Sequence, residues 1–328
     1  MVRRLPRLRF YEILLLADFA AVVLLLRLRA RLGLDVVRTL LDMREFVAFV
    51  APVLLGGILL RALLAARRGR RRGAARLRAL LRPRSLVDLA RFLVAMALTS
   101  YVYSWLKLAL PLLRPDVLFD QGLFRFETVL HFGVNPGRLL QGLFPYPALW
   151  KALDGYYGAF IFTVIAGVGW FAATLSIRDR ARFAAGFTLL WVLGSWFYLA
   201  VPSLGPCYVL KDDYTDVRAS MPSQSATMDL LFAHYGRVRS FHRRPEGTDL
   251  SPYLGVAAMP SLHVAAQAFL MLFARKRSRA LFLLYAALTA VTFFTAVGSG
   301  WHYAIDGYAA LLFAWVAFAA GSRSVPSA

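Results

Sequence analysis

Long apolar stretches alternate with short polar turns along most of the 328-residue chain. Several of these stretches hold about 18 or more mostly apolar residues, which is the length that an α-helix needs to cross the hydrocarbon core of a bilayer, and the stretch at 260–273 is shorter. The pattern predicts about eight such helices, at residues 11–28, 46–65, 86–110, 156–175, 182–201, 260–273, 281–297 and 302–320. We therefore expect an all-α integral membrane protein.

Two segments depart from this pattern. Residues 111–147 carry apolar side chains at helical spacing with charges between them: Phe119, Leu123, Phe126 and Leu130. This spacing predicts an amphipathic helix, either lying at the membrane interface or packed against the bundle. Residues 202–255 are rich in Pro, Ser, Asp and Arg. They predict a long polar connection, and a connection of that length is usually functional or disordered.

The charge pattern indicates topology. The formal net charge is +21, and most of the basic residues are arginines at the ends of apolar stretches. With eight spans, the strongly basic segments fall on one side of the membrane, together with both termini: residues 67–84, 178–182 and 275–279. Basic loops remain in the cytoplasm, so we expect that side to be cytoplasmic and no nucleic-acid partner. Arginine in preference to lysine suggests a GC-rich genome, and we expect a bacterial plasma membrane.

Two histidine-bearing turns stand on the opposite, extracytoplasmic side of this predicted topology. The first is Met259-Pro260-Ser261-Leu262-His263, and the second runs from Gly298 through His302 to Asp306. Because His302 and Asp306 are four residues apart, they share one face of a helix. The carboxylate can then fix the tautomer of the imidazole and leave its second nitrogen free to act as a nucleophile or base.

The first turn has the properties of a phosphate site. Pro260 at a helix start leaves the amides of Ser261, Leu262 and His263 unpaired, and a helix N-terminus with free amides attracts phosphate. A protonated His263 can give its proton to a leaving oxygen, while His302 attacks phosphorus. Two histidines with different neighbours therefore favour phosphoryl transfer.

Phosphoryl transfer also needs cations to spread the charge on the phosphate oxygens. Lys107 and Arg114 are seven residues apart at the end of the predicted helix 86–110, so two helical turns separate them and both can face one phosphate. The single cysteine, Cys207, excludes an internal disulfide and a cysteine-based metal site.

These motifs resemble the type-2 phosphatidic acid phosphatase superfamily of membrane enzymes. Pro260 to His263 is similar to its second signature, Pro-Ser-Gly-His, and His302 to Asp306 resembles the end of the third, Ser-Arg-x5-His-x3-Asp. Lys107 to Pro115 is similar to the first signature, Lys-x6-Arg-Pro. The resemblance covers residues 103–320. It implies a catalytic membrane domain at residues 86–328 with a six-helix core, preceded by a two-helix extension with a basic cytoplasmic loop at residues 1–85.

The sequence departs from the common phosphatases of this superfamily in two places, and these departures indicate which branch it resembles. Thr295-Ala296 stands where the third signature has Ser-Arg, and two predicted helices separate Lys107 from His263. The Pro-Ser-Leu-His variant, the absent arginine and the Gly205-Pro206-Cys207-Tyr208 loop resemble the inositol phosphorylceramide synthase branch. In that branch Lys211, or an arginine of the loop, can take the phosphate-binding role in place of the Lys107 to Pro115 match.

The resemblance implies a phosphohistidine mechanism that needs no metal and no cofactor. His302 is then the nucleophile, Asp306 orients it, and His263 is the acid for the leaving lipid alcohol. The expected reaction moves a phospho-headgroup, such as phosphoinositol, from a phospholipid donor to a lipid alcohol acceptor. A lipid phosphate or pyrophosphate phosphatase that uses water is the alternative enzyme. A non-catalytic lipid transporter or scaffold is the alternative from another class.

Overall fold

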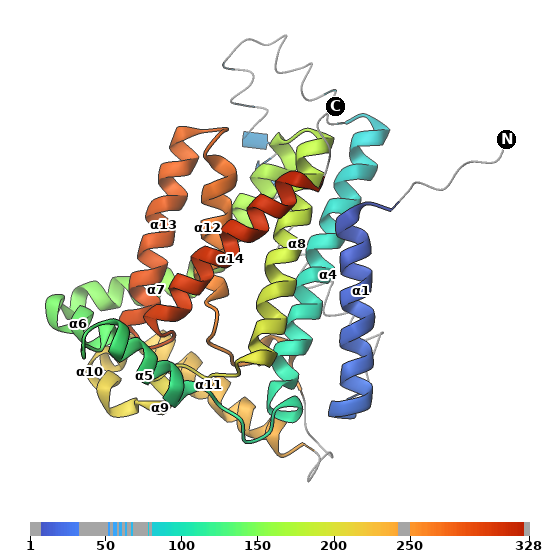
Figure 1. The fold of residues 1–328 in the computed structure, drawn as a ribbon. Helices are drawn as coiled ribbons and strands as arrows, with labels where there is room; N and C mark the ends of the chain where they lie inside the picture. Colours follow the sequence, from blue (N-terminus) through green and yellow to red (C-terminus); the bar gives the residue numbers. More distant parts are fainter. Residues whose placement is uncertain are drawn as a thin grey trace.

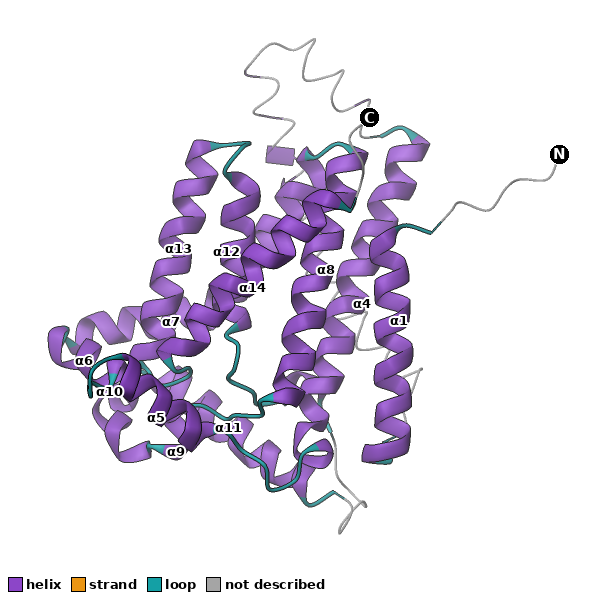
Figure 2. Ribbon diagram, in the orientation of Figure 1, coloured by secondary structure: helices purple, strands orange, loops and turns teal. Residues whose placement is uncertain are grey.

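The computed structural model describes residues 8–32, 81–241 and 250–324, together with isolated positions between 52 and 78. Over these residues the chain forms helices and turns and no β-strand, which confirms the predicted all-α class (Figure 2). Most of the predicted helix at 46–65 lies outside the described residues.

Seven helical segments form the bundle in Figure 1. Their bounds are α1 (Phe10–Leu25), α4 (Pro83–Leu113), α7 (Pro147–Thr174), α8 (Ile177–Ala200), α12 (Leu262–Ala274), α13 (Arg279–Gly298) and α14 (Ala304–Arg323). A short π-helix, η1 (Leu26–Ala30), continues α1. Among the described residues, five of these helices are long and apolar enough to cross a membrane, namely α4, α7, α8, α13 and α14. This result is consistent with an integral membrane protein, whereas the total of eight spans stays a prediction.

The centre of the bundle depends on small side chains that let helices approach closely. On α14, Ala310, Ala314 and Ala317 are fully buried, and a Cβ added to Gly321 would meet the Cα of Gly186 on α8 at 2.6 Å. In a membrane, where lipid is as apolar as a side chain, such close packing is what holds helices together. Helices α8, α12 and α14 thereby form a tight unit.

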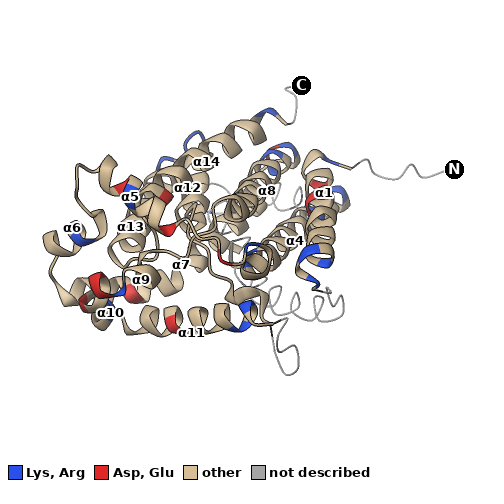
Figure 3. Ribbon diagram, turned by 60° about the horizontal axis from the view of Figure 1, so that its bottom comes forward, with Lys and Arg blue, Asp and Glu red and all other residues tan. Residues whose placement is uncertain are grey.

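The remaining helices lie at one end of the bundle. They are α5 (Asp120–Leu130), α6 (Pro136–Leu143), α9 (Pro206–Val209), η2 (Lys211–Tyr214), α10 (Thr215–Ser220), α11 (Pro222–Arg239) and η3 (Pro252–Leu254). The basic turns that follow α7 and α12 lie at the opposite end (Figure 1). Figure 3 views the former end and shows acidic positions on α5, α10 and α11.

This arrangement corrects the prediction of a polar connection at residues 202–255. Three α-helices and two short 3-10 helices occupy most of that stretch, and α11 alone is 18 residues long. Pro222 begins α11 at a position where its fixed φ angle suits a helix. Polar helices of this kind give no long apolar stretch, so hydropathy alone does not reveal them.

Candidate active site

His263 lies in the first turn of α12. Ser261 is the N-cap residue of that helix, and its backbone N–H donates to the carbonyl of Asp306 at 3.1 Å. The amide of Ser261 is therefore paired, which corrects the prediction that it is free to bind phosphate. The side chains of Ser261 and Leu262 are buried at 0% and 3% exposure.

His302 lies just before α14 rather than on it. The helix begins at Ala304, with Tyr303 as N-cap and Asp306 at its third position. The Asp306 Oδ2 atom accepts the backbone N–H of Tyr303 at 2.9 Å and lies 3.3 Å from Nδ1 of His302. The predicted contact between His302 and Asp306 thus forms, but through the helix cap and not through a shared helical face.

The two imidazoles meet in space although 39 residues separate them. Nδ1 of His263 lies 3.2 Å from Nε2 of His302. Because a carboxylate only accepts, the contact with Asp306 places a hydrogen on Nδ1 of His302 and leaves the lone pair of its Nε2 facing His263. The arrangement can therefore supply a nucleophilic nitrogen and, next to it, an acid.

One stretch of backbone, the Ser203–Cys207 loop, binds both histidine turns. The carbonyl and hydroxyl oxygens of Ser203 accept the amides of Ala258 at 2.9 Å and Met259 at 3.1 Å, just before the His263 turn. The amide of Cys207 donates to the carbonyl of Gly300 at 2.8 Å, just before His302. These bonds fix the two turns relative to each other.

Gly205, within this loop, has to be a glycine. Its φ angle is +107°, and an added Cβ would meet the carbonyl oxygen of Trp301 at 2.5 Å. Only a residue without a Cβ adopts that conformation without strain and allows such a close approach. The glycine of the Gly205-Pro206 pair singled out in the sequence is thus a structural requirement of the site.

Two carboxylates of α5 reach the same region, and sequence analysis did not identify them. Asp120 accepts the amides of Leu204 and Gly205 at 2.9–3.1 Å and the hydroxyl of Tyr303 at 3.1 Å. Glu127 accepts the amide of Ile305 at 3.2 Å. Burial raises the pKa of Glu127 to about 7, against the lowering effect of its amide hydrogen bonds. The available signal was their spacing of seven residues, which places both on one helical face.

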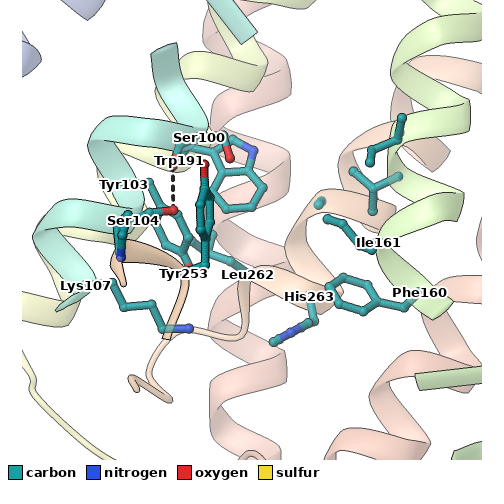
Figure 4. A pocket seen from close by; sticks show the side chains of 14 residues that line it. Ser100, Tyr103, Ser104, Lys107, Phe160, Ile161, Trp191, Tyr253, Leu262 and His263 are labelled. Atoms are coloured by element: carbon teal, nitrogen blue, oxygen red, sulfur yellow. Dashed lines mark hydrogen bonds between the residues drawn. The ribbon is translucent and has the colours of Figure 1, made fainter. Parts of the chain in front are cut away.

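A pocket of about 260 Å³ opens beside His263, between α4, α7, α8 and α12. Figure 4 shows Lys107 and His263 pointing toward one another across its mouth, with Phe160 and Ile161 on the α7 side. Most of the lining is apolar or aromatic: Tyr103, Phe160, Ile161, Val164, Ile165, Trp191, Pro252, Tyr253, Leu262 and Ala266. Such a lining can hold a hydrocarbon chain whose polar end lies at the histidines.

The three predicted cations lie in different surroundings. Lys107 lines the pocket with His263 and approaches the ring of Tyr103 at 5.7 Å. The Arg114 guanidinium donates to the carbonyl of Leu199 at 2.9 Å, at the end of α8. Lys211 is exposed and lies over the ring of Phe232 at 4.7 Å. Their role in phosphate binding stays a prediction for each, and Lys107 is the one that shares a pocket with a histidine.

Several buried polar atoms around the histidine pair have no hydrogen-bond partner in the described part of the chain. They are the hydroxyls of Tyr157 and Ser261, the indole N–H of Trp301 and Oδ1 of Asp306. The Tyr157 ring lies 5.3 Å from the His263 ring and 6.2 Å from that of Trp301. Buried polar groups are normally paired, so these atoms leave hydrogen-bonding capacity that a polar ligand could satisfy.

Comparison with known proteins identifies a family but no individual relative. No curated protein and no solved structure matches the chain significantly. The family model described as "PAP2 superfamily" matches residues 121–320, which is more than half of the chain and includes both histidine turns. Membership indicates a phosphatase or phosphotransferase, while the inositol phosphorylceramide synthase-like branch stays a prediction. The superfamily predicted from the signatures is confirmed, and the chain belongs to the PAP2 superfamily.

Proposed function

We propose that this protein is a membrane lipid phosphotransferase, which moves a phospho-headgroup from a phospholipid to a lipid alcohol through a phosphohistidine. The observation that carries the proposal is the convergence of His263, which lines an apolar pocket, with His302, behind which Asp306 lies. Phosphoinositol is the first headgroup to test, because the Pro-Ser-Leu-His turn and the Gly-Pro-x-Tyr loop resemble the enzymes that use it.

The reaction has two steps, in which bonds and protons balance. In the first, Nε2 of His302 bonds to phosphorus as the bond to the glycerol oxygen breaks, and His263 gives its proton to that oxygen. In the second, His263 takes the proton of the acceptor hydroxyl, whose oxygen attacks phosphorus and releases His302. Asp306 stabilises the positive charge on the His302 ring throughout.

The pocket supports a lipid as the alcohol in both steps. It adjoins His263, the residue that exchanges a proton with the alcohol oxygen, and its lining is mainly apolar. Lys107 at its mouth can neutralise phosphate oxygens, and the unpaired donors of Tyr157, Ser261 and Trp301 can bind them. These neutral donors and Lys107 offer what the missing arginine of the third signature would otherwise supply.

The topology supports an extracytoplasmic site. The starts of α12 and α14, where the two histidines lie, and helix α5 are at the end of the bundle opposite to the basic turns after α7 and α12 (Figure 1). Since basic turns remain in the cytoplasm, we place the reaction at the outer leaflet. We assign the catalytic domain to residues 86–328 and the membrane extension to residues 1–85.

The test is an assay of the purified chain in detergent micelles with phosphatidylinositol labelled in the headgroup. Transfer predicts diacylglycerol release that requires an added lipid alcohol, together with label in a new lipid. Label released as free phosphoinositol without acceptor would identify a hydrolase instead. No turnover with this or other phospholipids would favour the transporter.

Two variants make the assay specific to the histidine pair. His302→Ala should abolish turnover. His131→Gln is the matched control, because His131 is the C-cap residue of α5, lies against the hydroxyl of Tyr308 and has no part in the pair. Wild-type turnover in His302→Ala would contradict a phosphohistidine at this position.

A further inference from the structure

Helix α5 is oriented with its polar side toward the protein. Asp120 and Glu127 are buried at 3% and 2% exposure, whereas Phe126 and Val129 on the same helix are exposed at 61% and 77%. An amphipathic helix on a water-soluble protein buries the opposite face. The exposed apolar side fits the predicted contact with the membrane interface, and the buried carboxylates call for a separate explanation.

A buried carboxylate costs free energy unless its oxygens accept hydrogen bonds, so its partners indicate its role. In the described part of the chain, the groups that donate to Asp120 and Glu127 belong to the Ser203–Cys207 loop or to the turn after His302. Asp120 holds two loop amides and the Tyr303 hydroxyl, and Glu127 holds the amide of Ile305. Neither carboxylate forms an ion pair within the described residues.

The contacts of Asp120 with Tyr303 and of Glu127 with Ile305 lie within three residues of His302. Tyr303 is the residue that follows it, and the amide of Tyr303 donates to Asp306. The amide of Ile305 is one of the first of α14, which have no partner within their own helix. Glu127 supplies that partner from another helix, so the start of α14 is set by α5. A shift of this start would move His302 and Asp306 together relative to His263.

We propose that Asp120 and Glu127 are positioning residues, which hold the His302–Asp306 pair at the geometry needed to attack phosphorus. The inference rests on the proposed function and extends it from the three signature residues to a helix outside the signatures. Neither carboxylate is assigned to contact substrate. Their effect passes through Tyr303 and through the first amides of α14.

A purely structural role predicts a different outcome from a positioning role. Loss of a structural contact lowers the melting temperature and leaves kcat of the folded fraction unchanged. Loss of positioning lowers kcat, because a misplacement of about 1 Å can reduce a rate by about 100-fold. KM should change little, because the pocket beside His263 does not involve α5.

The experiment compares Glu127→Ala, Glu127→Gln and Asp120→Asn with the exposed α5 variants Gln121→Ala and Arg125→Ala. We expect kcat of Glu127→Ala to fall by at least about tenfold, with KM within about twofold of the wild type. Glu127→Gln retains an oxygen acceptor for the Ile305 amide and should recover most of the rate. The two exposed variants should match the wild type. Unchanged kcat in Glu127→Ala, or no difference between the Ala and Gln variants, would overturn the proposal.

A second measurement keeps this test separate from that of the proposed function. The chemical shifts of the His302 ring nitrogens are measured by NMR at one pH in the labelled chain without substrate. We expect changed shifts in Asp120→Asn and Glu127→Ala, and wild-type shifts in Gln121→Ala. Unaltered His302 shifts in both carboxylate variants would refute positioning. If the wild-type chain is inactive but the two carboxylate variants still change the His302 shifts, only the proposed reaction is refuted.

Discussion

The Nε2 atom of His302 lies 3.2 Å from Nδ1 of His263. The His263 imidazole therefore occupies the position that the phosphorus atom has to take when His302 attacks it. A reacting atom lies about 3 to 3.5 Å from its nucleophile before attack. The leaving oxygen is a bond further on, and the acid must still lie within about 3 Å of that oxygen. The two rings therefore have to separate when substrate binds.

This requirement predicts a change that a bound phosphate analogue should reveal. In a structure determined with vanadate, we expect the distance between the two ring nitrogens to exceed about 5 Å, with vanadium bonded to Nε2 of His302. His263 is the ring expected to move, because it is half-buried beside the pocket while His302 is nearly fully buried. Vanadate bound elsewhere, with the rings still in contact, would contradict this view.

A second prediction concerns the charge of Asp306. Its Oδ2 atom accepts both the Tyr303 amide and His302 Nδ1, so a single oxygen maintains the cap. Asp306→Asn can retain that oxygen but loses the negative charge that stabilises a positive imidazole. We expect kcat to fall by about 100-fold or more with little change in melting temperature. A rate close to that of the wild type would remove Asp306 from the mechanism.

The Lys107 and Arg114 pair gives a third prediction. Lys107 lines the pocket with His263, whereas the Arg114 guanidinium binds a carbonyl at the end of α8. We expect Lys107→Met to lower kcat/KM by about tenfold or more, because one charged contact to phosphate contributes about 1.5 to 3 kcal/mol. Arg114→Met should lower the melting temperature and reduce kcat/KM less than Lys107→Met does. The reverse order of effects on kcat/KM would identify Arg114 as the phosphate ligand.

Glu127 gives a prediction about stability and pH. Asp306 of α14 is the titratable side chain whose charge acts on it, and the charge of Glu127 acts in turn on Tyr308 of α14 and Tyr214 of η2. Its pKa rises from an ordinary value of 4.5 to about 7 on folding, mainly through burial. Between these values the folded chain binds the proton more tightly than the unfolded chain, so this group makes the protein less stable as pH rises from 4.5 through 7.

The size of that effect follows from the shift. It amounts to at most about 3 kcal/mol, and it is complete above the folded-state pKa. Thermal unfolding of the wild type and Glu127→Gln at pH 5 and pH 8 measures it. We expect the variant to lose less stability than the wild type between the two pH values. Identical losses would show that Glu127 does not titrate in this range.

The membrane helices were predictable because apolar length decides them. The predicted helix at 281–297 corresponds to α13 (Arg279–Gly298), and that at 182–201 corresponds to α8 (Ile177–Ala200). The ends differ by a few residues because capping, and not hydropathy, sets them. Ser176 and Ser278 each accept an amide of the first turn and start these helices before the apolar stretch begins.

The sequence predicts the histidines of the candidate site but not the loop and the carboxylates that hold them in place. Polar turns at the starts of two apolar helices suffice to identify His263 and His302 as candidates. The Ser203–Cys207 loop acts through backbone groups and the Ser203 hydroxyl, and only the glycine at 205 leaves a trace of this in the sequence. Asp120 and Glu127 alternate with apolar residues, and an amphipathic pattern conventionally assigns such charges to solvent. Only the fold reveals that they face the protein.

The dependence of both histidine turns on one loop has a consequence for protein engineering. A graft of the two signature helices alone onto another bundle would carry the imidazoles but not the backbone groups that set their separation. A graft that keeps the site intact has to include the Ser203–Cys207 loop and helix α5, whose Asp120 binds the amides of that loop. The smallest unit that could be transferred to another protein thus consists of α5, the Ser203–Cys207 loop and the segment from α12 to α14. These three parts are distant in the sequence, and a designer would have to transfer them together.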